Sequence, residues 1–182
     1  MLPRSLVLWS ILLIVPLSAC RTAGPAAARV EPAHRDPMPE PSTRERVRLV
    51  FLGDTGDRNE AMEGVRPAVR AEKADIVVVL GDLVYPVAPS CPEGKMTPEA
   101  REVLDDLVGG LLRDLADSVY LVLGNHDVAH GDRDPAREAC LIDYAASEPT
   151  LWLPDLAYGV DLGVVNLMVL NTNALTDDQA KQ

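Results

Sequence analysis

Three apolar runs, each stopping at a glycine followed by an oxygen-bearing side chain, constrain the fold of this sequence most. They are residues 49–54 (LVFLGD), 76–82 (IVVVLGD) and 120–127 (YLVLGNHD). Runs rich in β-branched and apolar residues suit strands buried on both faces, as in a mostly parallel sheet covered by helices. In open α/β sheets, ligands bind beyond the carboxyl ends of the strands. The pattern predicts an α/β fold with Asp54, Asp82 and Asn125 on one rim.

These strand ends indicate a metal site. Carboxylate and amide oxygens are ligands that hard cations prefer. The alternative is a set of ordinary turns, because glycine accepts a positive φ and aspartate bonds its own backbone. Three such breaks in succession, the last of them carrying His126 and Asp127, favour the metal site.

The same blocks resemble the first three signature blocks of calcineurin-like metallophosphoesterases, and in particular the purple acid phosphatase branch. Many members outside that branch have a histidine ligand two residues after the first aspartate, where this chain has Gly56. The purple branch lacks that histidine and uses a tyrosine three residues after the second aspartate, where this chain has Tyr85. The resemblance covers roughly residues 48–182. It implies an incomplete α/β/β/α sandwich, with the first sheet, its helices and the start of the second sheet.

The resemblance also implies a centre of two metal ions, Fe(III) and a divalent Fe, Zn or Mn ion. The implied protein ligands are Asp54, Asp82, Tyr85 and Asn125. Asp82 would bridge the ions, since a carboxylate has two oxygens, and Tyr85 as a phenolate would favour Fe(III). The substrate implied for a complete domain is a phosphate ester.

His126 and Asp127 are the implied catalytic residues. By resemblance, His126 donates to the phosphoryl or leaving-group oxygen, and Asp127 orients its ring. The alternative for this pair is a metal-binding dyad of the kind that lies on a helix, whereas this pair follows a strand. His130 is within reach of a phosphate in principle, but a solvated loop residue is the favoured interpretation.

The family pattern takes further histidine ligands from later Val-x-x-His-like and Gly-His-x-His-like blocks. The histidines of this chain are His34, His126 and His130, and none stands in such a block. We therefore expect the sequence to cover the front part of a phosphoesterase domain and to be poorly active as given. The alternative is a non-catalytic lipoprotein or binding module derived from that fold. A Rossmann-type or P-loop nucleotide binder is disfavoured, because no Gly-x-Gly-x-x-Gly follows a strand.

The amino terminus predicts an exported bacterial lipoprotein. After Arg4, ten of the twelve residues 6–17 are apolar, which is too short to span a bilayer and fits a signal peptide. Residues 17–20 (LSAC) resemble a lipobox, so we expect lipidated Cys20 to anchor the protein in a membrane, facing the periplasm or in the outer membrane if the host has two. An uncleaved transmembrane anchor is the alternative. Residues 21–46 then form a Pro/Ala-rich tether, and residues 47–182 the amino-terminal portion of the phosphoesterase domain.

Charge and cysteine usage add two further expectations. The formal net charge is −11, aromatic residues make up 4 % and there is no basic stripe, so nucleic-acid binding is not expected. With Cys20 used for lipid, an exported chain favours a disulfide between Cys91 and Cys140 over two buried thiols.

Local signals predict the remaining elements. Residues 59–73 favour a helix in which Pro67 marks a restart, because a proline deep in a helix removes a backbone hydrogen bond. Thr97-Pro98 and Asp134-Pro135 are typical of an N-cap followed by a helical proline, and residues 103–115 form an apolar helical stripe. Residues 157–161 and 164–170 favour two strands joined by a tight turn, and residues 176–182 the start of another helix.

Overall fold

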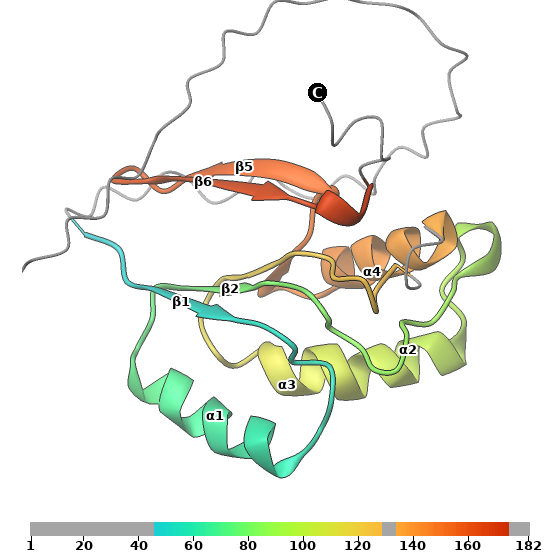
Figure 1. Cartoon of the computed structure of the whole chain (residues 1–182), viewed down its shortest axis with the longest axis horizontal. Helices are drawn as coiled ribbons and strands as arrows, with labels where there is room; N and C mark the ends of the chain where they lie inside the picture. Colours follow the sequence, from blue (N-terminus) through green and yellow to red (C-terminus); the bar gives the residue numbers. More distant parts are fainter. Residues whose placement is uncertain (1–45, 129–133, 175–182) are drawn as a thin grey trace, which may run out of the picture. The chain divides into compact units, whose positions relative to one another are not determined.

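The computed structural model describes residues 46–128 and 134–174. A four-stranded parallel sheet runs in the order β1-β2-β3-β4, and β5 and β6 form a separate antiparallel pair (Figure 1). The strands are β1 (Leu49–Leu52), β2 (Ile76–Val79), β3 (Val119–Leu121), β4 (Leu151–Trp152), β5 (Ala157–Asp161) and β6 (Asn166–Leu170). The predicted α/β class with a parallel sheet is confirmed. The two-residue strand β4 was not predicted.

Strand β2 is buried on both faces, as its unbroken β-branched sequence predicts. Alternate residues face opposite sides of the sheet. Val77 and Val79 pack into the larger core, which the helices help to form, whereas Ile76 and Val78 pack with Val160 of the hairpin β5–β6. Helices and hairpin thus hold the central strand in place, together with the residues that follow it.

Helix α1 (Glu60–Ala71) begins at Asn59, whose side chain accepts a hydrogen bond from the backbone N–H of Met62. The predicted restart at Pro67 is wrong, because the helix runs through this exposed proline. Met62 and Val69 are buried on either side of Pro67 in the sequence, so the same apolar stripe holds both halves of the helix in the core.

The second helical run begins as predicted, with Thr97 capping α2 (Pro98–Leu104). It continues through a π-helical turn, η2 (Asp105–Gly109), into α3 (Gly110–Leu112). The turn ends at the first glycine of the Gly109-Gly110 pair. Most residues of the predicted apolar stripe are buried or packed against the core, but Val103 is 39 % exposed and is not part of the core.

Helix α4 (Pro135–Ser147) is capped by Asp134, as predicted. The predicted disulfide is also present: Cys91, just before the short helix η1 (Pro92–Gly94), is bonded to Cys140 of α4. The disulfide ties the loop that follows Tyr85 to this helix. The strand predicted at 157–161 is confirmed, and the next begins at Asn166 because Leu162 N–H and the Val165 carbonyl close the turn.

Several predictions lie outside the described residues. These are the signal peptide with Cys20, nearly all of the tether with His34, the loop residue His130 and the helix from residue 176. Within the described ranges, no helix is long and apolar enough to cross a membrane.

Candidate metal centre

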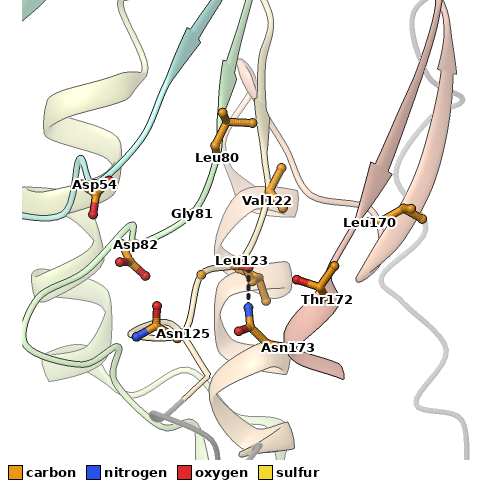
Figure 2. A pocket seen from close by; sticks show the side chains of 11 residues that line it. Asp54, Leu80, Gly81, Asp82, Val122, Leu123, Asn125, Leu170, Thr172 and Asn173 are labelled. Atoms are coloured by element: carbon orange, nitrogen blue, oxygen red, sulfur yellow. Dashed lines mark hydrogen bonds between the residues drawn. The ribbon is translucent and has the colours of Figure 1, made fainter. Parts of the chain in front are cut away.

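The sheet brings three predicted site residues to one rim. Asp54, Asp82 and Asn125 follow β1, β2 and β3, and Figure 2 shows their side chains gathered beyond the strand ends. Asp54 has φ 55° and Asp82 has φ 54°, both in the left-handed region that aspartate tolerates better than most residues. Both aspartates therefore turn the chain sharply where it leaves the sheet.

Close backbone contact at this rim depends on glycine. A Cβ atom added to Gly81, which has φ 99°, would lie 2.7 Å from the Cα of Gly124. A Cβ atom added to Gly124 would overlap Oδ1 of Asp82. The glycines that end the second and third apolar runs are thus needed for Asp82 and Asn125 to lie side by side.

The Tyr85 hydroxyl lies between the two aspartates. Its oxygen is 2.8 Å from Asp54 Oδ1 and 2.9 Å from Asp82 Oδ2, so the two carboxylates share the single hydroxyl proton as hydrogen-bond acceptors. The pKa of Tyr85 is raised above its usual range by desolvation, by these hydrogen bonds and by the negative charge of both partners. Two acidic groups and a phenol at this spacing form a compact set of hard oxygen donors.

His126 faces the same loop as Tyr85. Its backbone N–H donates to Asp82 Oδ1 at 3.1 Å, and its ring centroid is 4.4 Å from that of Tyr85. Nδ1 lies 2.7 Å from the carbonyl oxygen of Pro86, so Nδ1 carries a proton and donates it. This contact fixes the orientation of the ring.

Asp127 is placed differently from the prediction. Its side chain is fully buried: Oδ1 accepts from the backbone N–H groups of Leu83 and Val84, and Oδ2 from that of Gly124. Burial raises the pKa of Asp127 to about 7, although the three amides lower it. We expected Asp127 to orient the ring of His126, but the Pro86 carbonyl makes that contact. The Asp127 side chain turns into the protein, whereas the ring of His126 faces the loop after Tyr85.

Gly56 lies against the loop that carries Tyr85. Its N–H donates to the Asp82 carbonyl at 2.9 Å, and its own carbonyl accepts from the Tyr85 N–H at 3.0 Å. A Cβ atom at this position would overlap the backbone of Leu83 and Val84. No side chain of any kind fits at residue 56 without moving this loop.

A cavity of about 320 Å³ opens at the rim. Sequence reasoning missed the part of its wall that comes from the end of β6 and from η3 (Thr172–Ala174). Asn173 Nδ2 donates to the Leu123 carbonyl at 3.1 Å, which ties this segment to the end of β3 (Figure 2). The available signal was the run Asn171-Thr172-Asn173, which places oxygen-bearing side chains directly after an apolar strand.

The donor set has the chemistry of a hard-cation site but is small. It combines two carboxylates, one phenol and one amide, all with oxygen donors. Among residues 46–128 and 134–174, no three His, Cys, Asp or Glu side chains group in a way that could hold a metal ion. The rim therefore offers oxygen ligands that fit a cation and would need additional ligands, such as water, to complete its coordination.

Comparison with known proteins adds a family to this geometry. The model of the family described as calcineurin-like phosphoesterase matches residues 47–177, a range that includes every predicted site residue. No curated protein matches the sequence.

Proposed function

The chain belongs to the calcineurin-like phosphoesterase family, and we propose that it is a metal-dependent hydrolase of phosphate esters of the purple acid phosphatase type. Membership implies phosphoester hydrolysis, and the family typically uses two metal ions. The observation that carries the proposal is the Tyr85 hydroxyl, which lies within hydrogen-bonding distance of both Asp54 and Asp82 at the strand ends.

Asp54, Asp82, Tyr85 and Asn125 are the proposed ligands of the two ions. When bound, such ions supply an activated water and neutralise the charge of the phosphoryl group. The two oxygens of Asp82 already face different partners, the His126 N–H and the Tyr85 hydroxyl, which suits a carboxylate that bridges. Ionisation of Tyr85 is disfavoured beside two carboxylates, so the phenolate form needs a strong cation, and Fe(III) is our proposed choice beside a divalent Fe, Zn or Mn ion.

The subtype rests on Gly56 and Tyr85 together. The backbone of Val84 fills the space where a side chain at residue 56 would begin, so a histidine ligand cannot be added there. The Tyr85 oxygen lies 2.8 Å from Asp54, the residue two positions before Gly56. Tyrosine thus supplies a donor on the side of the rim where a histidine at residue 56 has no room.

His126 is the proposed proton donor to the ester. Because its Nδ1–H is engaged by the Pro86 carbonyl, donation through Nε2 requires the doubly protonated ring. We propose that Asp127 is a positioning residue rather than a catalytic one. It joins the loops that carry Tyr85 and His126, through the amides of Leu83, Val84 and Gly124.

Export and lipid anchoring remain part of the proposal. Residues 1–20 would be a lipoprotein signal peptide ending at Cys20, and residues 21–46 a tether. The Cys91–Cys140 disulfide supports an oxidising compartment, because disulfides persist mainly outside the cytosol.

A non-catalytic lipoprotein is the second candidate. The observation that favours it is the small donor set, since the described ranges contain no group of three His, Cys, Asp or Glu side chains suited to a metal. Such a protein would bind metal weakly and hydrolyse no ester.

One experiment tests both candidates. The full chain is dialysed against Zn²⁺, its metal content is measured, and the same samples are assayed with p-nitrophenyl phosphate. We expect Asp82→Asn to weaken metal binding by about tenfold or more, since even loss of an outer partner of a ligand costs this much. The control Asp117→Asn makes the same chemical change at an exposed position between α3 and β3 and should behave as wild type.

A wild-type chain that holds no metal, or an Asp82→Asn variant that holds as much, would contradict the proposed centre. Metal binding without hydrolysis of p-nitrophenyl phosphate would favour the non-catalytic candidate.

A further inference from the structure

A second asparagine lines the cavity beside the proposed metal centre. Asp54, Asp82 and Asn125 line the cavity from the strand ends of the parallel sheet, whereas Asn173 lines it from η3, directly after the hairpin β5–β6 (Figure 2). Asn173 therefore belongs to a part of the chain from which the proposed metal centre takes no ligand. Its side-chain oxygen has the same chemistry as that of Asn125.

Hydrogen bonds fix the orientation of the Asn173 amide. The Asn173 backbone N–H donates to Asn171 Oδ1 at 3.0 Å, so the Asn171 atom at this contact must be an acceptor oxygen. Asn173 Nδ2 donates to the same Oδ1 at 3.1 Å and to the Leu123 carbonyl at 3.1 Å. Since both partners are acceptors, the Asn173 atom that faces them is the nitrogen, and both protons of its NH₂ group are engaged.

The side-chain oxygen of Asn173 is left as an acceptor. Figure 2 shows the Asn173 nitrogen directed at Leu123 and the oxygen turned to the side on which Asn125 lies. Within residues 46–128 and 134–174, no group donates a hydrogen bond to this oxygen. An amide oxygen can accept two hydrogen bonds. Asn173 thus offers a fixed acceptor at the cavity that contains the proposed metal ligands.

A cation at the rim would bring hydrogen-bond donors to this acceptor. The protein ligands there are few, so water is needed to complete the coordination of a cation held by Asp54 and Asp82. Water on a cation is polarised and donates its protons readily. Groups that accept from the ligands of a metal hold those ligands in place and raise the affinity of the site.

We propose that Asn173 is a positioning residue of the metal centre, whose side-chain oxygen accepts a hydrogen bond from water on the cation. This inference rests on the proposed function, since it takes a cation to lie at Asp54 and Asp82. The bonds of Asn173 to Leu123 and Asn171 hold the oxygen in place before a cation arrives. The segment after the hairpin would thus contribute to cation affinity without supplying a direct ligand.

The test is a calorimetric titration of Zn²⁺ into the full chain in the absence of substrate. Asn173→Ala removes the oxygen and both NH₂ protons and should weaken Zn²⁺ binding about tenfold, as loss of an outer partner of a metal ligand does. Asn173→Asp removes the same protons but keeps an oxygen, so it should bind Zn²⁺ at least as tightly as the wild type. If Asn173 acted only through its bonds to Leu123 and Asn171, both substitutions would weaken binding.

Matched controls come from the other end of β6. Asn166 is exposed and is not among the residues that line the cavity. Asn166→Ala and Asn166→Asp should therefore leave Zn²⁺ affinity close to that of the wild type, and the second of them measures the effect of an added charge alone. Asn173 is exposed as well, so neither of its substitutions empties the core.

A spectroscopic signature in the wild-type chain tests the same contact without any variant. A hydrogen bond to an amide oxygen changes the electron density of the whole amide group. The side-chain NH₂ signals of Asn173 in a ¹⁵N–¹H NMR spectrum should therefore shift when Zn²⁺ is added, whereas those of Asn166 should stay in place.

The outcomes separate this inference from the proposed function. Unchanged Zn²⁺ affinity in Asn173→Ala, an Asn173→Asp variant as weak as Asn173→Ala, or Asn173 signals that Zn²⁺ does not shift would each overturn the role of Asn173. Zn²⁺ binding that still depends on Asp82 would then leave the proposed function standing. A wild-type chain that binds no Zn²⁺ would overturn both.

Discussion

At the scale of single residues, the geometry of the rim depends on buried side chains that form hydrogen bonds with the backbone of the site loops. Asp127 illustrates this. It is fully buried, and both of its carboxylate oxygens accept hydrogen bonds from backbone amides of two different loops. When the Asp127 carboxylate is ionised, such bonds are stronger than those between neutral groups. Asp127 therefore sets the distance between the loop that carries Tyr85 and the loop that carries His126.

The substitution Asp127→Asn tests this role in the metal-free protein. Asparagine keeps one acceptor oxygen and places an NH₂ group against a backbone donor, which should cost about 1–3 kcal/mol of unfolding free energy and lower the melting temperature by several degrees. The control Asp143→Asn makes the same change at a half-buried residue of α4, and its melting temperature should be close to that of the wild type. If the two variants have the same melting temperature, the hydrogen bonds of Asp127 do not hold the loops in place.

At the scale of elements, the site exists because neighbouring strand ends and loops approach closely at three glycines. Gly81 and Gly124 bring the ends of β2 and β3 into backbone contact, and Gly56 does the same for the loop after β1 and the loop of Tyr85. On the far side of that loop, the Cys91–Cys140 disulfide joins it to α4. The loop is therefore fixed at both of its ends.

Removing the disulfide should destabilise the whole domain. It closes a chain segment with a sequence separation of 49 residues. A cross-link of this kind restricts the unfolded chain, so Cys91→Ser combined with Cys140→Ser should lower the unfolding free energy by about 2–4 kcal/mol in a denaturant titration. Reduction of the wild-type protein should reproduce the effect. A double variant as stable as the oxidised wild type would show that the cross-link contributes nothing.

At the scale of the whole molecule, the sequence was most informative where pattern and chemistry are local. The three strands that end at the rim, the caps at Thr97 and Asp134 and the residues at the strand ends could all be predicted, because each depends on a few neighbouring residues. Burial on both faces was predicted for all three strands but holds only for β2 and β3, since Phe51 of β1 is 52 % exposed. The buried direction of Asp127 and the contact of Asn173 with Leu123 could not, since both depend on segments that are distant in sequence. Pro67 was mispredicted because packing on the core outweighs the lost hydrogen bond.

The predicted anchoring also concerns the whole molecule. In a bacterial host that processes lipoproteins, the full chain should incorporate labelled palmitate and sediment with membranes, whereas Cys20→Ser should do neither. The Cys91→Ser/Cys140→Ser variant should keep the label, since those cysteines do not follow a lipobox-like segment. Label that persists in Cys20→Ser would contradict lipidation at this residue.

The most direct test of the central claim, that Tyr85 and its neighbours hold a metal, is the visible absorption spectrum of the chain loaded with Fe(III). We expect a broad charge-transfer band from tyrosinate to Fe(III), which Tyr85→Phe should abolish. Tyr158→Phe, which alters a tyrosine whose hydroxyl donates to the Leu121 carbonyl and which is not among the residues that line the cavity, should leave the band intact. A band that survives in Tyr85→Phe, or a wild-type chain that binds Fe(III) without one, would contradict the assignment of Tyr85 as a metal ligand.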